Sequence, residues 1–245
     1  MTESSQYPYD VILFDLDGTI SDSAPGITAS LRHCFDAVGI EQPSDDEISK
    51  YLGPPLSAAL RDWHGLDEAM AERGVQAYRE VYHDNNEYNA TIFEGMPALL
   101  QELNDIGIPI ATATSKPIES VTRVLDHFEL THHFVMIGGA QLDGTNSKKP
   151  DVINYVFDEM QIHPNSHRII MIGDRSHDVH GAKHHGIPVV GVEWGYADAG
   201  ELEAAGADYV VGSVAELRVL LLGEKHQLPP HSAAAGPSHV STPKH

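Results

Sequence analysis

Short apolar runs rich in β-branched residues alternate with amphipathic segments along most of the chain. The runs lie at residues 11–15, 108–114, 133–139, 168–174, 187–192 and 207–212. Segments with the helical spacing of apolar residues lie between them, at 96–107, 118–128, 150–160 and 177–186. Strands that are apolar along their whole length are typical of parallel sheets buried on both faces. The alternation therefore predicts an α/β fold with a Rossmann-like, doubly wound parallel sheet.

One region interrupts the alternation. Between about residues 21 and 92 no strong strand pattern occurs, whereas helical patterns recur at 25–38, 44–51, 55–63 and 67–88. We expect a helical insertion after the first strand, at the sheet edge where open α/β sheets bind ligands, and in that position it could act as a lid. The last segment, 224–245, is rich in Pro, Ser, Ala and His, and this composition predicts a disordered tail.

The charge balance limits the class of partner. The chain of 245 residues carries a formal charge of −21, which disfavours nucleic acid polymers and anionic membranes. A single cysteine, Cys34, excludes an intrachain disulfide, and neither a signal-like N-terminus nor an apolar run of membrane-spanning length is evident. We therefore expect a cytoplasmic protein that acts on a small soluble metabolite. The sequence does not decide between a monomer and a homodimer.

Two carboxylates follow the first predicted strand. Asp15 ends the apolar run, Asp17 follows after one leucine, and Gly18 allows a sharp turn. Side chains two residues apart in a strand point the same way, so we expect both carboxylates to converge on one point. Paired buried carboxylates are unfavourable unless a cation offsets their charge, and a metal ion would do so. A polar strand end with an Asp-Gly turn is the plainer alternative.

Further polar residues follow other predicted strands. A hydroxyl and free backbone amides after one strand could bind a phosphate oxygen, an acidic pair one helical turn apart follows another, and two lysines precede a helix. Helix capping and ordinary surface charge explain each of these separately. Together, at one edge of a parallel sheet, they point to a site for phosphate and metal. The residues are Thr114, Ser115, Lys148, Lys149, Asp174 and Asp178.

The order of these motifs resembles the four-motif signature of the haloacid dehalogenase superfamily, across residues 10–178. The stretch from Gly186 to Leu217, "GIPVVGVEWGYADAGELEAAGADYVVGSVAEL", is similar to the end of its phosphoglycolate phosphatase-like branch. Within that branch "YLGPPL", "TSKP" and "DGTNSKKPDVI" resemble a 5′-nucleotidase-like subgroup. The resemblance implies a core at 1–20 and 93–223 with a helical cap of the C1 type at 21–92.

The resemblance also implies a role for each residue. Asp15 would be the nucleophile that forms an aspartyl-phosphate intermediate, and Asp17 the general acid and base. Mg²⁺ would be held by the Asp15 carboxylate, the Asp17 main-chain carbonyl and Asp174. The groups that bind the phosphoryl oxygens or support the metal would be Thr114, the Ser115 backbone, Lys149 (preferred over Lys148), Gly173 and Asp178.

The expected activity is hydrolysis of a small phosphate monoester, either a nucleoside 5′-monophosphate or a compound like phosphoglycolate. A sugar-phosphate phosphomutase and a catalytically silent binding protein of the same fold are the alternatives. A zinc site at His177, His180 and His184 is a weaker interpretation than a solvated helix face. For the candidate substrate contacts in the insertion, a surface position is the plainer reading of each; they are Arg32, Tyr51 and Arg61.

Overall fold

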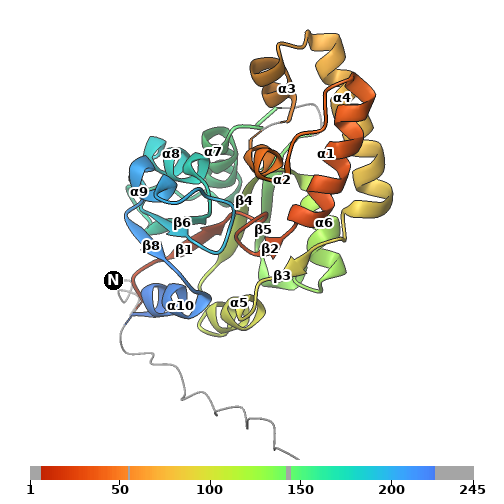
Figure 1. Cartoon of the computed structure of the whole chain (residues 1–245). Helices are drawn as coiled ribbons and strands as arrows, with labels where there is room; N and C mark the ends of the chain where they lie inside the picture. Colours follow the sequence, from red (N-terminus) through yellow and green to blue (C-terminus); the bar gives the residue numbers. More distant parts are fainter. Residues whose placement is uncertain (1–6, 55, 142–144, 224–245) are drawn as a thin grey trace, which may run out of the picture.

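The structure, a computed structural model, describes residues 7–54, 56–141 and 145–223. The predicted tail at 224–245 lies outside the described residues. Within them, a sheet with helices on both faces forms one part of the molecule, and a group of helices stands beside one end of that sheet (Figure 1).

The sheet has six parallel strands. They are β1 (Val11–Phe14), β4 (Ile110–Pro117), β5 (Met136–Ala140), β6 (Ile169–Gly173), β7 (Val189–Val192) and β8 (Tyr209–Val211), in the order β5-β4-β1-β6-β7-β8. The chain builds outward from β1 through β4 to β5, and then returns to the other side of β1 for β6. The carboxyl end of β1 is therefore the point where the strand order reverses, which is where such sheets bind ligands. The predicted doubly wound parallel sheet is confirmed.

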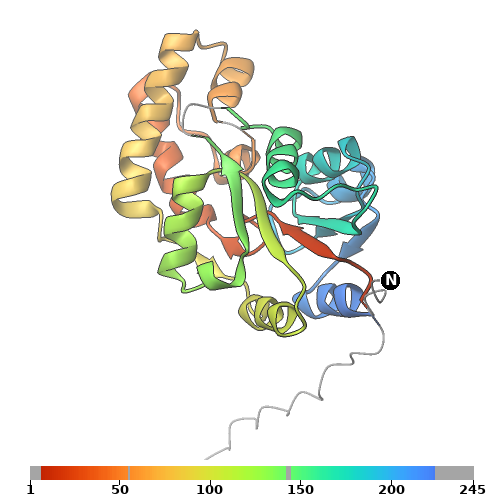
Figure 2. The ribbon, with the colours of Figure 1, turned by 180° about the vertical axis from the view of Figure 1, so that it is seen from behind.

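Helices cover both faces of the sheet (Figure 2). One face packs against α5 (Met96–Asp105), α6 (Ile118–His127) and α10 (Val214–Leu222), and the other against α7 (Lys149–Met160), α8 (Ser176–His184) and α9 (Glu201–Ala205). In β1, Ile12 and Phe14 belong to the first apolar cluster, whereas Val11 and Leu13 belong to the second. Burial on both faces explains why β1 is apolar at every position.

The helices beside the sheet come from the region between β1 and β4. We call residues 24–86 the helical unit; it contains α1 (Ala24–Val38), α2 (Asp45–Ile48), η1 (Ser49–Tyr51), α3 (Leu56–His64), α4 (Glu68–Val81) and η2 (Tyr82–Asn86). Apolar side chains of α1, α3 and α4 form a cluster of their own, separate from the two clusters of the sheet. The helical unit thus has its own small core.

Two very short strands connect the helical unit to the sheet. β2 (Ser21–Asp22) enters it and β3 (Thr91–Ile92) leaves it, and the two pair antiparallel, with Ser21 opposite Ile92. The sequence did not predict this pair. The remaining short element of the described chain is the turn η3 (Thr131–His133).

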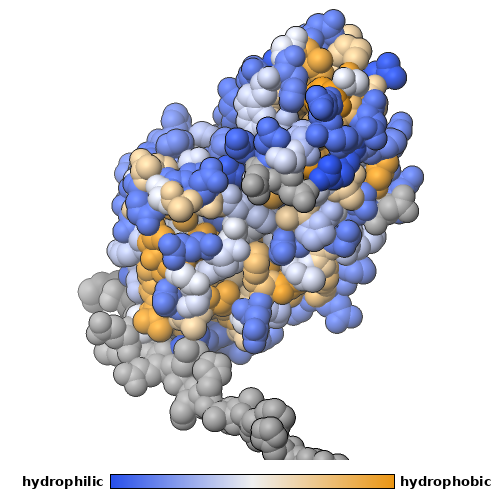
Figure 3. Space-filling model, in the orientation of Figure 1, coloured by the Kyte–Doolittle hydropathy of each residue, from blue (hydrophilic) through white to orange (hydrophobic). Residues whose placement is uncertain are grey.

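The surface agrees with the charge balance. The face in Figure 3 is mainly hydrophilic, with small separate apolar areas, as a chain with a formal charge of −21 leads one to expect. In the part of the chain that the structure describes, no helix combines the length and the apolar character needed to span a bilayer.

Candidate active site

Asp15 lies at the reversal point of the sheet. It directly follows β1, and its backbone N–H donates to the carbonyl of Ile172 on β6 at 2.9 Å. The carboxyl ends of the two neighbouring strands bring Thr114 of β4 and Asp174, which follows β6, to the same edge. Asp15 is 8% exposed, so its carboxylate lies largely out of water.

Three buried carboxylates gather at this edge. One oxygen each of Asp15, Asp174 and Asp178 lies within 4.8 Å of the other two, and among the described residues no other acidic, histidine or cysteine side chains form such a group. Glycines make this close approach possible. A Cβ atom at Gly173 would lie 2.2 Å from the Asp178 carboxyl carbon, and one at Gly18 would lie 2.1 Å from an Asp174 oxygen. Gly18 also has a φ of +81°, which other residues rarely adopt.

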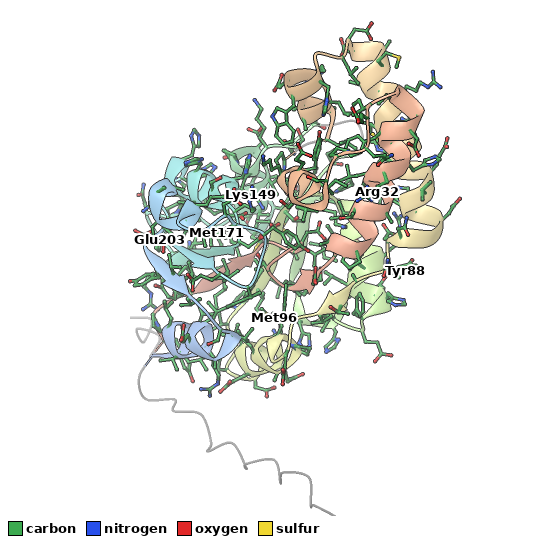
Figure 4. The ribbon with its side chains drawn as sticks, in the orientation of Figure 1. Arg32, Tyr88, Met96, Lys149, Met171 and Glu203 are labelled. Atoms are coloured by element: carbon green, nitrogen blue, oxygen red, sulfur yellow. The ribbon has the colours of Figure 1, made fainter. Side chains whose placement is uncertain are left out.

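A single buried lysine faces the group. Lys149, the first residue of α7, places its Nζ 2.9 Å from Asp15 Oδ1 and 2.7 Å from Asp178 Oδ1, and donates to the carbonyl of Ala113 at 2.9 Å (Figure 4). Neither of these two carboxylate oxygens receives another hydrogen bond. Its neighbour Lys148 is exposed. One ammonium group therefore contacts two of the three carboxylates.

The electrostatics reflect this imbalance. Burial, reinforced by the charge of Asp178, raises the pKa of Asp15 from 3.8 to about 6, although Lys149 and the Thr114 hydroxyl act in the opposite direction. Burial and the two neighbouring carboxylates raise the pKa of Asp174 well above its ordinary value, despite a hydrogen bond of 2.7 Å from the Tyr196 N–H. These carboxylates would ionise more readily beside an additional positive charge.

The site fits a divalent metal ion. Its oxygen-only set of carboxylates suits Mg²⁺, and Asp15 Oδ1 and Asp178 Oδ1 keep lone pairs that no hydrogen bond occupies. A dication held by Asp15, Asp174 and Asp178 would supply the positive charge that Lys149 alone does not provide.

Asp17 has different partners from those expected. The group of three contains the Asp178 carboxylate and not that of Asp17, although Asp15 and Asp17 line the same cavity. The Asp17 carboxylate lies 3.0 and 3.1 Å from Lys116 Nζ, and accepts a hydrogen bond of 2.7 Å from the Ser23 hydroxyl. The reason is that β1 ends at Phe14, so the alternation of a strand does not extend to Asp17.

The site opens into a cavity of about 420 Å³ between the sheet and the helical unit. The sheet side contributes Asp15, Asp17, Thr114, Ser115, Lys149 and Asp178, and the helical unit contributes apolar, aromatic and basic side chains, including Ile27, Leu31, Tyr51, Arg61, Val75, Tyr78, Arg79 and Tyr82. A larger and more open hollow of about 700 Å³ lies beside Asp10, at the other end of β1, away from the carboxylates.

The other candidates divide between the cavity and the surface. Tyr51 and Arg61 line the cavity. Arg32, which Figure 4 labels on α1, does not line it, and its carbonyl accepts a hydrogen bond from Gln42. His177 borders the cavity, but together with His180 and His184 it forms no metal-binding group among the described residues.

Two further residues lie around the site. The sequence offers two equal interpretations of Lys116, facing the crevice or belonging to a capped loop in "TSKP", whereas it does not single out Tyr196. Lys116 is buried between Asp17 and Tyr82. The Tyr196 hydroxyl accepts hydrogen bonds from the backbone N–H groups of Ser23 and Ala24 at 2.8 and 3.0 Å, which fixes the entry to the helical unit. The structure places Lys116 at the crevice, on the same strand as Thr114. No comparable sequence pattern marks Tyr196.

A sheet whose first strand ends in this acidic site, followed by a helical insertion, defines the class of protein. Residues 12–192 match the family model of the haloacid dehalogenase-like hydrolases, so the chain belongs to that family. The membership that the four motifs indicated is confirmed, and so is the predicted hydrolase class.

Similar proteins have been named for different activities. The tyrosine-protein kinase PtkA of Mycobacterium tuberculosis is 39% identical over 213 residues, which cover 86% of this chain and 72% of the relative. A 5′-nucleotidase of Pseudomonas aeruginosa is 36% identical over 213 residues, 87% of this chain and 96% of the relative. The crystal structure of a predicted phosphatase from Clostridium acetobutylicum has a TM-score of 0.82 at 38% identity, covering 86% of this chain and 96% of the other.

Proposed function

We propose that the chain is a Mg²⁺-dependent phosphatase that hydrolyses a small phosphate monoester through an aspartyl-phosphate intermediate on Asp15. The observation that supports this most directly is the position of the Asp15 carboxylate. It lies at the wall of the cavity, beside Lys149 and within the group of three carboxylates. Bound Mg²⁺ would screen the negative charge of the substrate phosphate and of these carboxylates.

The reaction would proceed in two displacements. In the first, an Asp15 oxygen forms a bond to phosphorus while the bond from phosphorus to the ester oxygen breaks, and Asp17 gives a proton to the departing oxygen. In the second, a water oxygen attacks the same phosphorus, the bond to Asp15 breaks, and Asp17 takes the proton of the water. The Thr114 hydroxyl, the Ser115 backbone and Lys149 would hold the phosphoryl oxygens during both displacements.

The division of the chain expected from the sequence is part of the proposal. Residues 1–20 and 93–223 form the catalytic core, and residues 21–92, which include the helical unit, form a cap over the cavity. Closure of the cap would exclude bulk water while phosphorus is transferred to Asp15.

The cavity favours a nucleoside 5′-monophosphate as substrate. Tyr51, Tyr78 and Tyr82 line the same cavity as Asp15 with aromatic surface, and Leu31 and Val75 line it with apolar surface. A nucleobase would bury its flat faces against such walls, whereas a two-carbon acid such as phosphoglycolate has no comparable apolar surface. The 5′-nucleotidase relative supports the same choice.

The test is phosphate release from a panel of nucleoside 5′-monophosphates, 2-phosphoglycolate and p-nitrophenyl phosphate. We expect activity that requires Mg²⁺, is lost with EDTA, and falls at least about a thousandfold in Asp15→Asn, since this removes the nucleophile. Undiminished hydrolysis by Asp15→Asn would remove Asp15 from the mechanism. Phosphorus NMR of the products separates hydrolysis from a phosphomutase, in which phosphate returns to the substrate.

Protein-tyrosine phosphorylation is a second candidate, because the relative at 39% identity is named a tyrosine-protein kinase. Incubation with ATP labelled at the γ-phosphate and a tyrosine-containing polypeptide distinguishes the two. A kinase would transfer the label to tyrosine, whereas the proposed monoester hydrolase would leave the polypeptide unlabelled.

A further inference from the structure

Lys116 is a buried cation with no part in the two displacements. Its side chain is only 6% exposed, and its Nζ contacts both oxygens of Asp17, at 3.0 and 3.1 Å, and the hydroxyl of Tyr82, at 2.5 Å. The Nζ also lies 4.8 Å from the centre of the Tyr82 ring. Burying an ammonium group is costly unless it is paired, so these contacts account for its position.

The charge of Lys116 is maintained by its surroundings. Burial lowers the pKa of its ammonium group, but the Asp17 carboxylate and the two tyrosines Tyr82 and Tyr78 outweigh burial, so that the pKa is raised. Lys116 therefore stays charged, and its ammonium group donates hydrogen bonds to the Asp17 carboxylate.

The backbone of β4 brings Lys116 to this position. The predicted strand ended at residue 114, whereas β4 continues to Pro117, with a shift in its pairing to β5 between Ala113 and Pro117. The N–H of Lys116 donates to the Thr114 hydroxyl at 3.3 Å. Lys116 is thus part of the rigid sheet edge that also carries Thr114.

Tyr82 comes from the other part of the molecule. It lies in η2 of the helical unit, is 4% exposed, and stacks on Tyr78 of α4 with ring centres 5.3 Å apart. The contact between Lys116 and Tyr82 therefore joins the sheet edge to the helical unit directly beside Asp17. Movement of the helical unit away from the sheet would separate Tyr82 from Lys116.

We propose that Lys116 is a positioning residue that, together with Tyr82, orients the Asp17 carboxyl group toward the leaving oxygen of the substrate. The inference rests on the proposed function, because it assigns Asp17 the proton transfer. It adds that Asp17 is correctly oriented only while the helical unit covers the cavity, so that proton donation is coupled to closure.

The test compares two substrates whose leaving groups differ in whether they need a proton. Departure of an alcohol from a nucleoside 5′-monophosphate requires a proton, whereas p-nitrophenolate leaves without one. We compare kcat/KM for the two esters, because this constant reports only the steps up to departure of the first product. In Lys116→Met we expect kcat/KM to fall about ten- to hundredfold for the nucleotide and less than about threefold for the aryl ester, with unchanged inhibition by inorganic phosphate.

Three further variants complete the experiment. Asp17→Asn should show the same selectivity with a larger loss, and Tyr82→Phe, which keeps the ring and removes the hydroxyl, the same selectivity with a smaller loss. Lys183→Met is the matched control, because Lys183 is a half-exposed lysine paired with Asp208 at 2.8 Å, and should leave both constants unchanged.

An equal loss for both esters, or weaker inhibition by phosphate, would show that Lys116 supports the fold or binds phosphate, and would overturn the proposal. If circular dichroism shows that Lys116→Met does not fold, an equal loss of kcat/KM for both esters in Tyr82→Phe is sufficient to overturn the proposal. Failure of the proposed function gives a different result, since Asp15→Asn would then hydrolyse both esters as the unmodified enzyme does.

Discussion

Replacing Asp15 by Asn is predicted to abolish activity and to stabilise the metal-free protein at the same time. Burial and Asp178 raise the pKa of Asp15 from 3.8 to about 6 in the folded protein. Ionising one carboxyl group with such a pKa costs the folded state about 3 kcal/mol relative to the unfolded chain. Because Asn carries no charge, the variant avoids this cost, and we expect a gain of about 2–3 kcal/mol at pH 7.5.

The direction of this pKa shift also determines how the free energy of unfolding depends on pH. With a raised pKa, folded Asp15 binds more protons than the unfolded chain between pH 4 and 6, so metal-free wild type loses stability as the pH rises through this window. The gain of Asp15→Asn should therefore grow from about pH 4 to 6 and stay constant above it. Urea unfolding in EDTA, at several pH values, measures this difference.

Mg²⁺ should reduce or cancel this difference in stability. Binding to the folded state stabilises wild type by about 2.7 kcal/mol at a hundredfold excess over Kd, and the variant, with one carboxylate fewer, should gain less. Asp10→Asn is the control at the opposite end of β1. Arg168 donates to Asp10 and lowers its pKa, so this variant should lose up to about 1 kcal/mol instead of gaining stability. An Asp15→Asn protein no more stable than wild type in EDTA would refute the electrostatic reasoning.

Three other substitutions or reagents test separate contacts. Gly173→Ala places a Cβ 2.2 Å from the Asp178 carboxyl carbon and should destabilise the protein by about 1–3 kcal/mol. Calorimetry should also show weaker Mg²⁺ binding, and an unchanged Tm would contradict the close approach. The buried Cys34 thiol, whose pKa is raised to about 11 by burial, should react with Ellman's reagent only in denaturant, and fast labelling of native protein would argue against its burial. Glu201 is half-buried, which opposes ionisation, but hydrogen bonds from Ser176 and Arg175 outweigh this and lower its pKa to about 2. Glu201→Gln should therefore be less stable than wild type at pH 7, with the difference disappearing as the pH falls to about 2 and below; a constant difference across this range would exclude this linkage.

The sheet could be predicted because its signal is local and repeated. A parallel strand buried on both faces must be apolar at each position, so runs such as Val11–Phe14 stand out from the amphipathic helices around them. The pair β2 and β3 carries no such signal. Each strand has two residues and exists because the chain enters and leaves the helical unit at one place, which is a property of the tertiary structure.

The site was predictable where a strand end sets the position of a side chain. Asp15, Thr114 and Asp174 lie at the ends of adjacent strands, as the motif order indicated. The partners of Asp17 could not be predicted in this way, because the chain leaves the strand at Phe14 and because the position of Lys116 depends on a shift in strand pairing. A buried lysine and a surface lysine look the same in a sequence, and only the packing of Tyr82 distinguishes them here.

The pairing of Ser21 with Ile92 has a consequence for how such enzymes can be altered. Since the polypeptide departs and comes back through neighbouring residues, the intervening helices impose almost no geometric demand on the strands that carry Asp15 and Asp174. The entropic penalty for a longer or shorter excursion between two fixed points grows only slowly with its length. A different helical module, or a brief turn, could be spliced between these two positions while the catalytic strands keep their register, which makes this junction a natural place for recombination.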